Sequence, residues 1–110
     1  MTDLNQVTLM GRLTDDPKSF NGKSTVAKFS IAINKQWKDQ SGEQHEKVSF
    51  IKCNVFGKFG EWCAGNLSKG FQVIVSGELE QNRWEDQQGD KHSDIQVNVD
   101  FLRIVSKPRD

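Results

Sequence analysis

The chain has 110 residues, with 15 basic and 15 acidic side chains and a formal net charge of zero. This length fits one small domain, which we expect at residues 1–106, followed by a short polar C-terminal end at 107–110. The balanced charge argues against a protein that attracts nucleic acid by net charge alone. No apolar run is long enough to cross a bilayer, and the N-terminus lacks a signal-peptide pattern, so we expect a cytoplasmic protein without a membrane partner.

The two cysteines, Cys53 and Cys63, are too few for a disulfide scaffold and do not form a CxxC pair. The other soft ligands are His45 and His92, which do not have the spacing of a zinc site. We therefore expect no metal and no cofactor, and we interpret both cysteines as small core residues.

The first strand is predicted at residues 5–13, where apolar and polar side chains alternate. Gly11 lies inside this strand and indicates a bulge or the close approach of another backbone. Two turn signals follow, Asp16-Pro17 and Asn21-Gly22, so the segment after the first strand is predicted as turns.

A long second strand is predicted at residues 25–37, with an apolar face that ends at Ile33. Lys35 and Trp37 continue this face beyond the core. The polar segment 38–43 has a central glycine and predicts the tip of a hairpin that joins the second and third strands. Trp37 is therefore expected near this tip, because its charged neighbours disfavour the alternative of an ordinary core aromatic.

The third strand is predicted at residues 48–57. Three side chains on one of its faces suit a core: Ile51, Cys53 and Val55. The other face carries two aromatics, a cation and an amide: Phe50, Lys52, Asn54 and Phe56. Two large Phe side chains are unusual on a solvated face, whereas a surface that stacks bases and holds phosphates has this composition. The alternative is that both faces are buried and Lys52 reaches out to solvent.

After the third strand, the apolar spacing changes to that of a short helix, with one face formed by four residues: Phe59, Trp62, Cys63 and Leu67. Two glycines inside this segment weaken it, so the helix is expected to depend on packing. Gly70 is expected to stop the helix. We predict that Trp62 belongs to the core and does not contact a ligand.

The last part of the chain is predicted as a strand, a polar extension, a hairpin turn and a final strand: residues 71–79, 80–85, 86–90 and 95–105. Gly77 again indicates a bulge. Leu79 and Ile95 are predicted to point inward with the other apolar residues of their strands. Trp84 lies on the polar extension and is expected to be exposed.

The expected fold class is all-β with one short helix. Three strands, one helix and two strands follow one another in the order of the OB-fold, a five-stranded barrel that binds oligonucleotides and oligosaccharides. The alternative is another small β-barrel or sandwich of unspecified function.

Several ordered stretches support a closer assignment: 5–13 with Asp16-Pro17, 29–32 leading to Trp37, 50–58, 67–70 running into 73–79, and Arg83-Trp84. In these stretches the sequence resembles the bacterial, phage and mitochondrial single-stranded DNA-binding proteins. The resemblance implies an OB-fold homotetramer, associated with the nucleoid, that binds and protects single-stranded DNA without sequence preference in replication, recombination and repair.

The family's base-stacking aromatics fall on four positions of this chain: Trp37, Phe50, Phe56 and Trp84. Position 50 is usually Trp in the family, so Phe50 keeps a stacking face of smaller size. The candidate phosphate contacts are six cations: Arg12, Lys35, Lys38, Lys52, Lys58 and Arg83. Lys52 and Arg83 are favoured among these because aromatic side chains flank them.

Family members usually continue into a flexible linker and a short acidic tail that recruits replication and repair enzymes. This sequence ends at the polar segment 107–110 without the usual acidic tail, which either was removed or was never present, so recruitment through such a tail is left open. Replication and repair proteins are kept as candidate partners.

An enzyme is not expected either, because Gly57-Lys58 lacks the upstream glycine of a phosphate-binding loop. Cys53 points to the predicted core and has no evident histidine partner. The remaining alternative is an OB-fold protein-interaction module, such as a primosome-type adaptor, with a weaker DNA role.

Overall fold

The computed structural model describes residues 2–109, which form six strands and one helix. The elements follow in the order β1 (Val7–Leu13), β2 (Lys18–Asn21), β3 (Thr25–Lys38), β4 (Gln44–Phe56), α1 (Gly57–Asn66), β5 (Gln72–Glu85) and β6 (Lys91–Ser106). Within the described residues, no helix is long and apolar enough to cross a membrane.

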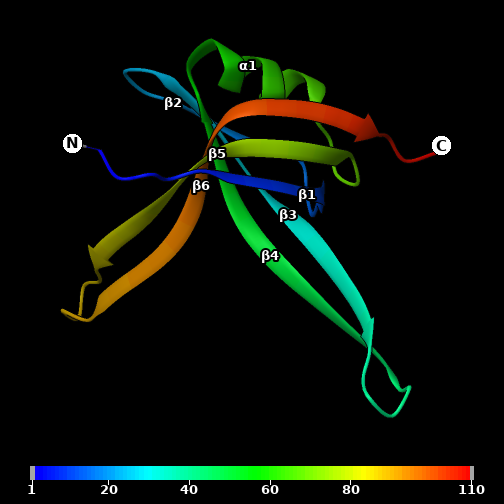
Figure 1. The fold of residues 1–110 in the computed structure, drawn as a ribbon. Helices are drawn as coiled ribbons and strands as arrows, with labels where there is room; N and C mark the ends of the chain where they lie inside the picture. The colour runs from blue at the N-terminus through cyan, green and yellow to red at the C-terminus, as the bar shows by residue number, and fades with distance from the viewer. Residues whose placement is uncertain (1, 110) are drawn as a thin grey trace.

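Five of the strands close into a barrel (Figure 1). The strand order is β1-β5-β6-β4-β3, and β1 also pairs with β3, which closes the ring. The β4–β6 pairing is parallel and the other pairings are antiparallel, while β2 extends the sheet beyond β3. This arrangement confirms the predicted OB-fold. The β3–β4 and β5–β6 hairpins both project well beyond the barrel (Figure 1).

The core lies inside this ring and consists of twelve buried side chains: Leu13, Ala27, Phe29, Ile31, Cys53, Val55, Cys63, Leu67, Val73, Val75, Val97 and Val99. The alternation predicted for β4 is confirmed, because Cys53 and Val55 face the core. Both cysteines are buried and unpaired. Burial raises the pKa of the Cys53 thiol to about 12 and that of Cys63 to about 11.

Two strand glycines mark close contacts between backbones, as predicted. A Cβ atom on Gly11 would lie 2.7 Å from the carbonyl oxygen of Ala32, where β1 and β3 meet to close the barrel. A Cβ atom on Gly77 would lie 2.0 Å from the carbonyl oxygen of Asn98, and the β5–β6 register shifts between Ser76 and Gly77. The predicted bulge at Gly77 is therefore present.

The prediction that Trp62 belongs to the core is wrong, because its side chain is 44% exposed. The buried positions of α1 are Gly60 and Cys63. Gly60 packs so closely that a Cβ atom would lie 2.3 Å from the carbonyl oxygen of Val55. With Gly60 against the barrel, Trp62 lies on the flank of the helix, where its ring centroid is 6.2 Å from that of Phe59.

The helix also ends before Gly70, contrary to the prediction. Asn66 is its last residue, and the backbone N–H of Leu67 donates to the carbonyl oxygen of Cys63. Gly70 has a φ of 87° in the following turn, where its N–H donates to the carbonyl oxygen of Leu13. This glycine therefore connects the turn to β1 and does not cap the helix.

Several strand boundaries differ from the prediction because strand pairing extends beyond the apolar runs. β2 was not predicted, and β4 and β6 begin earlier than expected. Leu79 and Ile95, predicted to point inward, are 43% and 61% exposed. Both lie where the β5–β6 hairpin leaves the barrel, so no core covers them.

Candidate nucleic-acid interface

The register of the strands arranges side chains into rows across the outer face of β2, β3 and β4. Directly paired residues of an antiparallel sheet share a face. One row joins Phe20, Val26 and Phe56, and the Phe56 side chain is 53% exposed. Another joins Arg12, Ala32 and Phe50, in which Phe50 is 68% exposed beside a small alanine. The outer face thus presents two separate aromatic side chains to solvent from β4.

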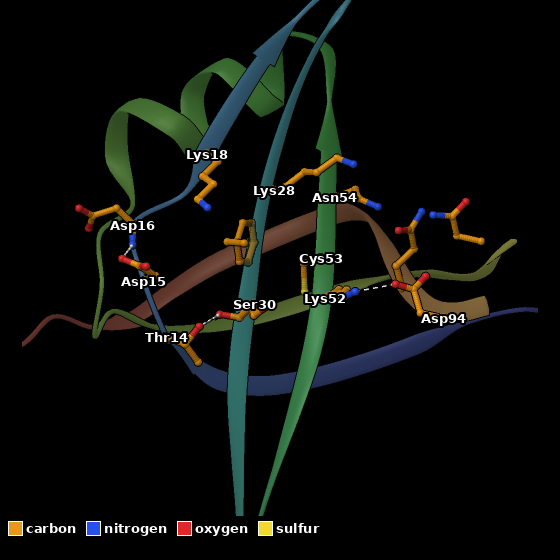
Figure 2. A pocket seen from close by; sticks show the side chains of 13 residues that line it. Thr14, Asp15, Asp16, Lys18, Lys28, Ser30, Lys52, Cys53, Asn54 and Asp94 are labelled. Atoms are coloured by element: carbon orange, nitrogen blue, oxygen red, sulfur yellow. Dashed lines mark hydrogen bonds and ion pairs between the residues drawn. The ribbon is translucent and has the colours of Figure 1, made fainter. Parts of the chain in front are cut away.

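A hollow of about 400 Å³, here called the lysine hollow, is drawn in Figure 2. It lies between these two aromatic rows in the strand register, and three aspartates also line it: Asp15, Asp16 and Asp94. Three lysines from three neighbouring strands line it: Lys18 on β2, Lys28 on β3 and Lys52 on β4. Lys18 pairs directly with Lys28 in the register, and the Lys28 ammonium lies 5.6 Å from the centroid of the Phe20 ring. The hollow therefore places cationic groups beside aromatic ones on a single face.

Sequence reasoning missed Lys18 and Lys28. The alternation along β3 could have found Lys28, because it lies on the outward-facing side of that strand, two residues from Val26 and from Ser30. The position of Lys18 could not be predicted in this way, because the four residues of β2 are all exposed and show no apolar alternation. Only the pairing of β2 with β3 brings the two lysines together.

Lys52, a predicted phosphate contact, already has an acidic partner. Its Nζ lies 2.6 Å from Oδ2 of Asp94, and the Lys52 side chain is 62% exposed. The other oxygen of Asp94, Oδ1, is buried and has no hydrogen-bond partner among the described residues. A phosphate that binds Lys52 would therefore compete with Asp94 for the same ammonium group.

Asn54 lies on the same strand face as Lys52, but it is only 3% exposed. Its predicted place on this face is confirmed, and at this position the alternative of a buried face with Lys52 reaching out to solvent holds. β6 pairs alongside β4 at this point, and the Asn54 Nδ2 donates to Oδ1 of Asn98 at 3.5 Å. The neighbouring strand thus covers Asn54 while Lys52 reaches past it.

Trp84 lies near the tip of the β5–β6 hairpin, directly opposite His92. The two rings are stacked, with centroids 5.5 Å apart, and Trp84 is 45% exposed. The next row on the same face toward the barrel pairs Asn82 with Asp94, so Trp84 shares the outer face with the lysine hollow. A second hollow of about 510 Å³ adjoins Trp84 and His92.

Trp37 has the same relationship to His45 near the tip of the β3–β4 hairpin. Its ring centroid lies 5.4 Å from that of His45, and Trp37 is 41% exposed, as expected. Lys35 lies two residues away on the same face, with its ammonium 5.5 Å from the Trp37 ring centroid. This face continues the inward positions of β3, so Trp37 lies on the opposite face of its hairpin from Phe50.

The predicted cations are distributed over several surfaces. Arg12 donates from Nη1 to the carbonyl oxygen of Gly70, and Arg83 donates from Nη2 to Oε1 of Gln81. Arg83 alternates with Trp84 along β5 and therefore lies on the opposite face of that hairpin. Lys38 alternates with Trp37 in the same way, and Lys58 lies in the first turn of α1.

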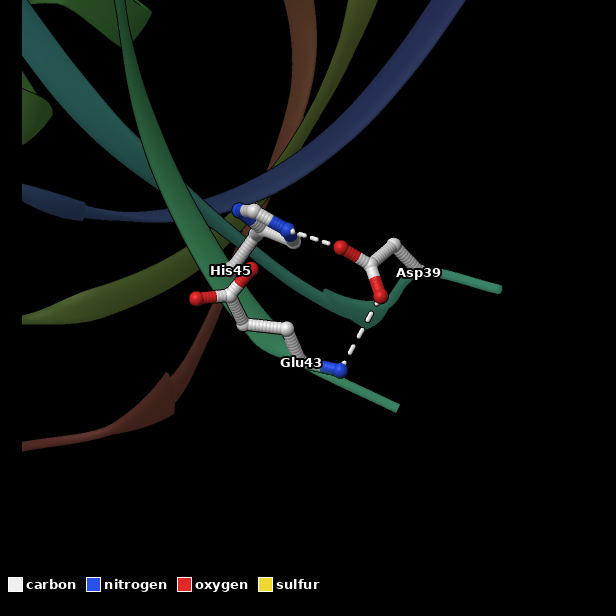
Figure 3. Close-up of side chains that lie close together, drawn as sticks. All are labelled: Asp39, Glu43 and His45. Carbon is white, nitrogen blue, oxygen red and sulfur yellow. Dashed lines mark hydrogen bonds and ion pairs between the residues drawn. The ribbon is translucent and has the colours of Figure 1, made fainter. Parts of the chain in front are cut away.

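A carboxylate organises the tip of the β3–β4 hairpin (Figure 3). Oδ1 of Asp39 accepts hydrogen bonds from the backbone N–H groups of Ser41 and Glu43, and its Oδ2 lies 2.8 Å from Nε2 of His45. These hydrogen bonds, that of His45 first, lower the pKa of Asp39.

The ligand atoms of Asp39, Glu43 and His45 lie within 4.8 Å of one another, as a metal site would require. Both oxygens of Asp39 are already hydrogen-bonded within the tip. We therefore interpret this group as a hairpin-tip hydrogen-bond network and assign no metal to it.

The fold and this surface define an OB-fold domain whose exposed aromatic residues lie beside basic ones. The sequence profile of the single-strand binding protein family matches residues 4–105. The chain therefore belongs to the single-strand binding protein family.

Curated relatives agree with this assignment. A protein from Aquifex aeolicus named single-stranded DNA-binding protein is 35% identical over 96% of this chain and 73% of its own length. A protein of the same name from Caldanaerobacter subterraneus is 36% identical over 93% of this chain and 68% of its own length.

Solved structures show the same fold. A Plasmodium falciparum SSB, in complex with ssDNA, has a TM-score of 0.88 at 23% identity and covers 96% of this chain and 98% of its own. A deletion mutant of the single-stranded DNA binding protein from Thermus aquaticus has a TM-score of 0.81 at 28% identity. It covers 94% of this chain and 51% of its own.

Proposed function

We propose that this protein binds single-stranded DNA without sequence preference, as the names of its relatives indicate for them. One observation carries the proposal: Phe50 and Phe56 are exposed on the outer face of β4 with Lys52 between them. Every base has a π-face, so stacking on aromatic residues tolerates any sequence, while cations beside them hold the phosphates. The zero net charge does not conflict with this, because stacking on aromatic residues needs no net charge, and the lysine hollow brings three ammonium groups to this face, with three aspartates beside them.

The proposed stacking residues are four of the exposed aromatics: Trp37, Phe50, Phe56 and Trp84. The proposed phosphate contacts are Arg12, Lys35, Lys38, Lys52, Lys58 and Arg83, to which the lysine hollow adds Lys18 and Lys28. Phe50, Phe56 and Trp84 share the outer face with this hollow. A single DNA strand that follows this face therefore meets aromatic and basic side chains in turn.

The biological role that fits this activity is protection of unpaired DNA in replication, recombination and repair, in the cytoplasm and near the nucleoid. The protein acts in this proposal as a binding protein and not as an enzyme. Replication and repair proteins are candidate partners.

We also propose that the chain forms a homotetramer. Met10 and Phe101 are 50% and 45% exposed on the outer face of β1, β5 and β6, and Ile74 lies between their strands on the same face. An exposed apolar face of this kind favours self-association. Light scattering at micromolar concentration tests the assembly, and a single chain of 12.5 kDa would contradict it.

Titration with oligo(dT) while Trp fluorescence is recorded tests the DNA-binding proposal. We expect quenching on saturation, and log K should fall with log[salt] by about 0.7 for each phosphate neutralised. A duplex of the same length should compete poorly. Equal affinity for duplex and single strand would overturn the proposal, and absence of binding to either would favour the protein-interaction adaptor.

A further inference from the structure

The two projecting hairpins end in the same sequence pattern. Residues 37–45 and residues 84–92 both have Trp, Asp, Gln, Gly and His in the order Trp-x-Asp-Gln-x-Gly-x-x-His. The chain contains two histidines in total, His45 and His92, and each occupies the last position of one pattern. The hydrogen bonds of the two hairpin tips explain why both tips carry the same residues.

The two tips have the same hydrogen bonds. Asp86 accepts through Oδ1 from the backbone N–H groups of Gln88 and Asp90, and its Oδ2 lies 2.8 Å from Nε2 of His92. These contacts reproduce those of Asp39 at the first tip. The tip glycines match as well, with φ angles of 82° at Gly42 and 84° at Gly89.

Both histidines also stack on the tryptophan across the hairpin. The interplanar angles are 22° for Trp37 with His45 and 21° for Trp84 with His92. When the imidazole is neutral, its Nε2–H donates to the aspartate and Nδ1 remains an acceptor. Figure 3 shows the second ring nitrogen of His45 pointing away from Asp39. Protonation therefore adds a positive charge and an outward N–H donor beside each tryptophan.

The charged groups around each histidine are of both signs. His45 faces Asp39 and Glu43 from the tip, Lys35 from β3, and Lys47 one row further along β4. Around the second histidine the charged groups are Asp86 and Asp90 from the tip, Arg83 and Glu85 from β5, Lys91 on its own strand, and Asp94, which binds Lys52. His92 lowers the pKa of Asp86, as His45 does that of Asp39, so both aspartates stay ionised near neutral pH.

We propose that His45 and His92 are phosphate-binding residues of two equivalent hairpin tips, in which protonated Nδ1–H contacts the DNA backbone beside a base stacked on the adjacent tryptophan. The inference rests on the proposed function. An anionic ligand is favoured because a histidinium held by aspartate has one remaining donor, directed outward. Protonation gives each imidazole a positive charge, so we expect the two tips to bind DNA more tightly in the protonated form.

Titration with oligo(dT) at pH 5.5 and pH 8 tests this inference, because thymine has no basic ring nitrogen that is protonated in this range. We expect the wild type to bind roughly tenfold more tightly at pH 5.5 for each histidine engaged, as one charge-assisted hydrogen bond would give. The salt slope should also be steeper at pH 5.5 by about 0.7 per phosphate held. The His45→Gln/His92→Gln variant should bind with the same affinity and the same salt slope at both pH values. Each single variant should keep about half of the wild-type difference in log K and in salt slope.

The His45→Lys/His92→Lys variant is the matched control, because it keeps a cation at both tips at either pH. It should bind with the same affinity and the same salt slope at pH 5.5 and pH 8. An equal pH dependence in the wild type and the double Gln variant would overturn the inference. Equal wild-type salt slopes at the two pH values would also overturn it, even if a variant failed to fold. Absence of oligo(dT) binding at every pH would instead overturn the proposed function.

Discussion

Lys52 and Asp94 form an ion pair on the outer face of the barrel, with Nζ and Oδ2 2.6 Å apart. The two residues come from neighbouring strands that run parallel, β4 and β6. The pair lies in the lysine hollow between the rows of Phe50 and Phe56. Asp94 therefore withholds one cation from the surface on which we propose that phosphates bind.

Asp94→Asn should strengthen single-stranded DNA binding, because it releases Lys52 and removes a negative charge from the DNA path. We expect a gain at low salt and a salt slope steeper by about 0.7 if Lys52 then binds one phosphate. Asp100→Asn is the control, since it makes the same charge change at an exposed position of β6. Equal gains in the two variants would mean that net charge, and not release of Lys52, changes the affinity.

Replacement of the two tip tryptophans should weaken DNA binding without unfolding the domain. Both side chains are partly exposed on hairpins outside the core, and loss of one base stack costs roughly 1–3 kcal/mol of binding free energy. Trp37→Ala and Trp84→Ala should each show this loss in oligo(dT) titrations. Trp62→Phe is the control for fluorescence, because Trp62 lies on the flank of α1. If Trp62→Phe alone abolished quenching, the helix would be the DNA-binding surface.

The alternation of apolar residues was sufficient to predict the barrel, because a strand with one buried face has a period of two. It correctly separated Cys53 and Val55 from Phe50 and Phe56 on β4. It could not predict the burial of Asn54, which depends on β6, a strand more than 40 residues away in sequence. Local patterns show which face a side chain occupies, whereas its burial depends on non-local pairing.

The error at Trp62 has a similar origin. A helical stripe in sequence favours the largest apolar residues as the buried ones, but α1 packs through a residue with no side chain. Gly60 brings the helix backbone against Val55, and with Gly60 and Cys63 facing the barrel, Trp62 lies on the flank of the helix. The two lysines of the hollow were missed because β2 carries no apolar pattern.

Gly60→Ala should destabilise the domain, whereas Gly65→Ala should not. A Cβ atom at position 60 would lie 2.3 Å from the backbone oxygen of Val55, and such overpacking costs typically about 1–3 kcal/mol or more. Gly65 is in the same helix with open space around it, so alanine there should stabilise by up to about 1 kcal/mol. Urea unfolding of the two variants measures both effects. Equal stabilities would contradict the packing of α1 on β4.

Ionisation of the buried cysteines should make the domain less stable at alkaline pH. Burial raises the pKa of Cys53 from 9.0 to about 12 and that of Cys63 from 9.0 to about 11. The unfolded chain therefore releases these two protons at lower pH than the folded chain does. Their contribution to stability is complete below pH 9 and is lost as pH rises toward 11 and 12.

Urea unfolding at pH 8 and pH 10 should show this loss in the wild type, and it should be smaller in the Cys53→Ala/Cys63→Ala variant. The variant is less stable at every pH because it has lost core atoms, so the comparison is between the two pH dependences. Thiol labelling provides an independent measurement, since both cysteines should react slowly in the native state and freely after unfolding. Rapid native labelling of Cys53 would contradict its position on the inward face of β4.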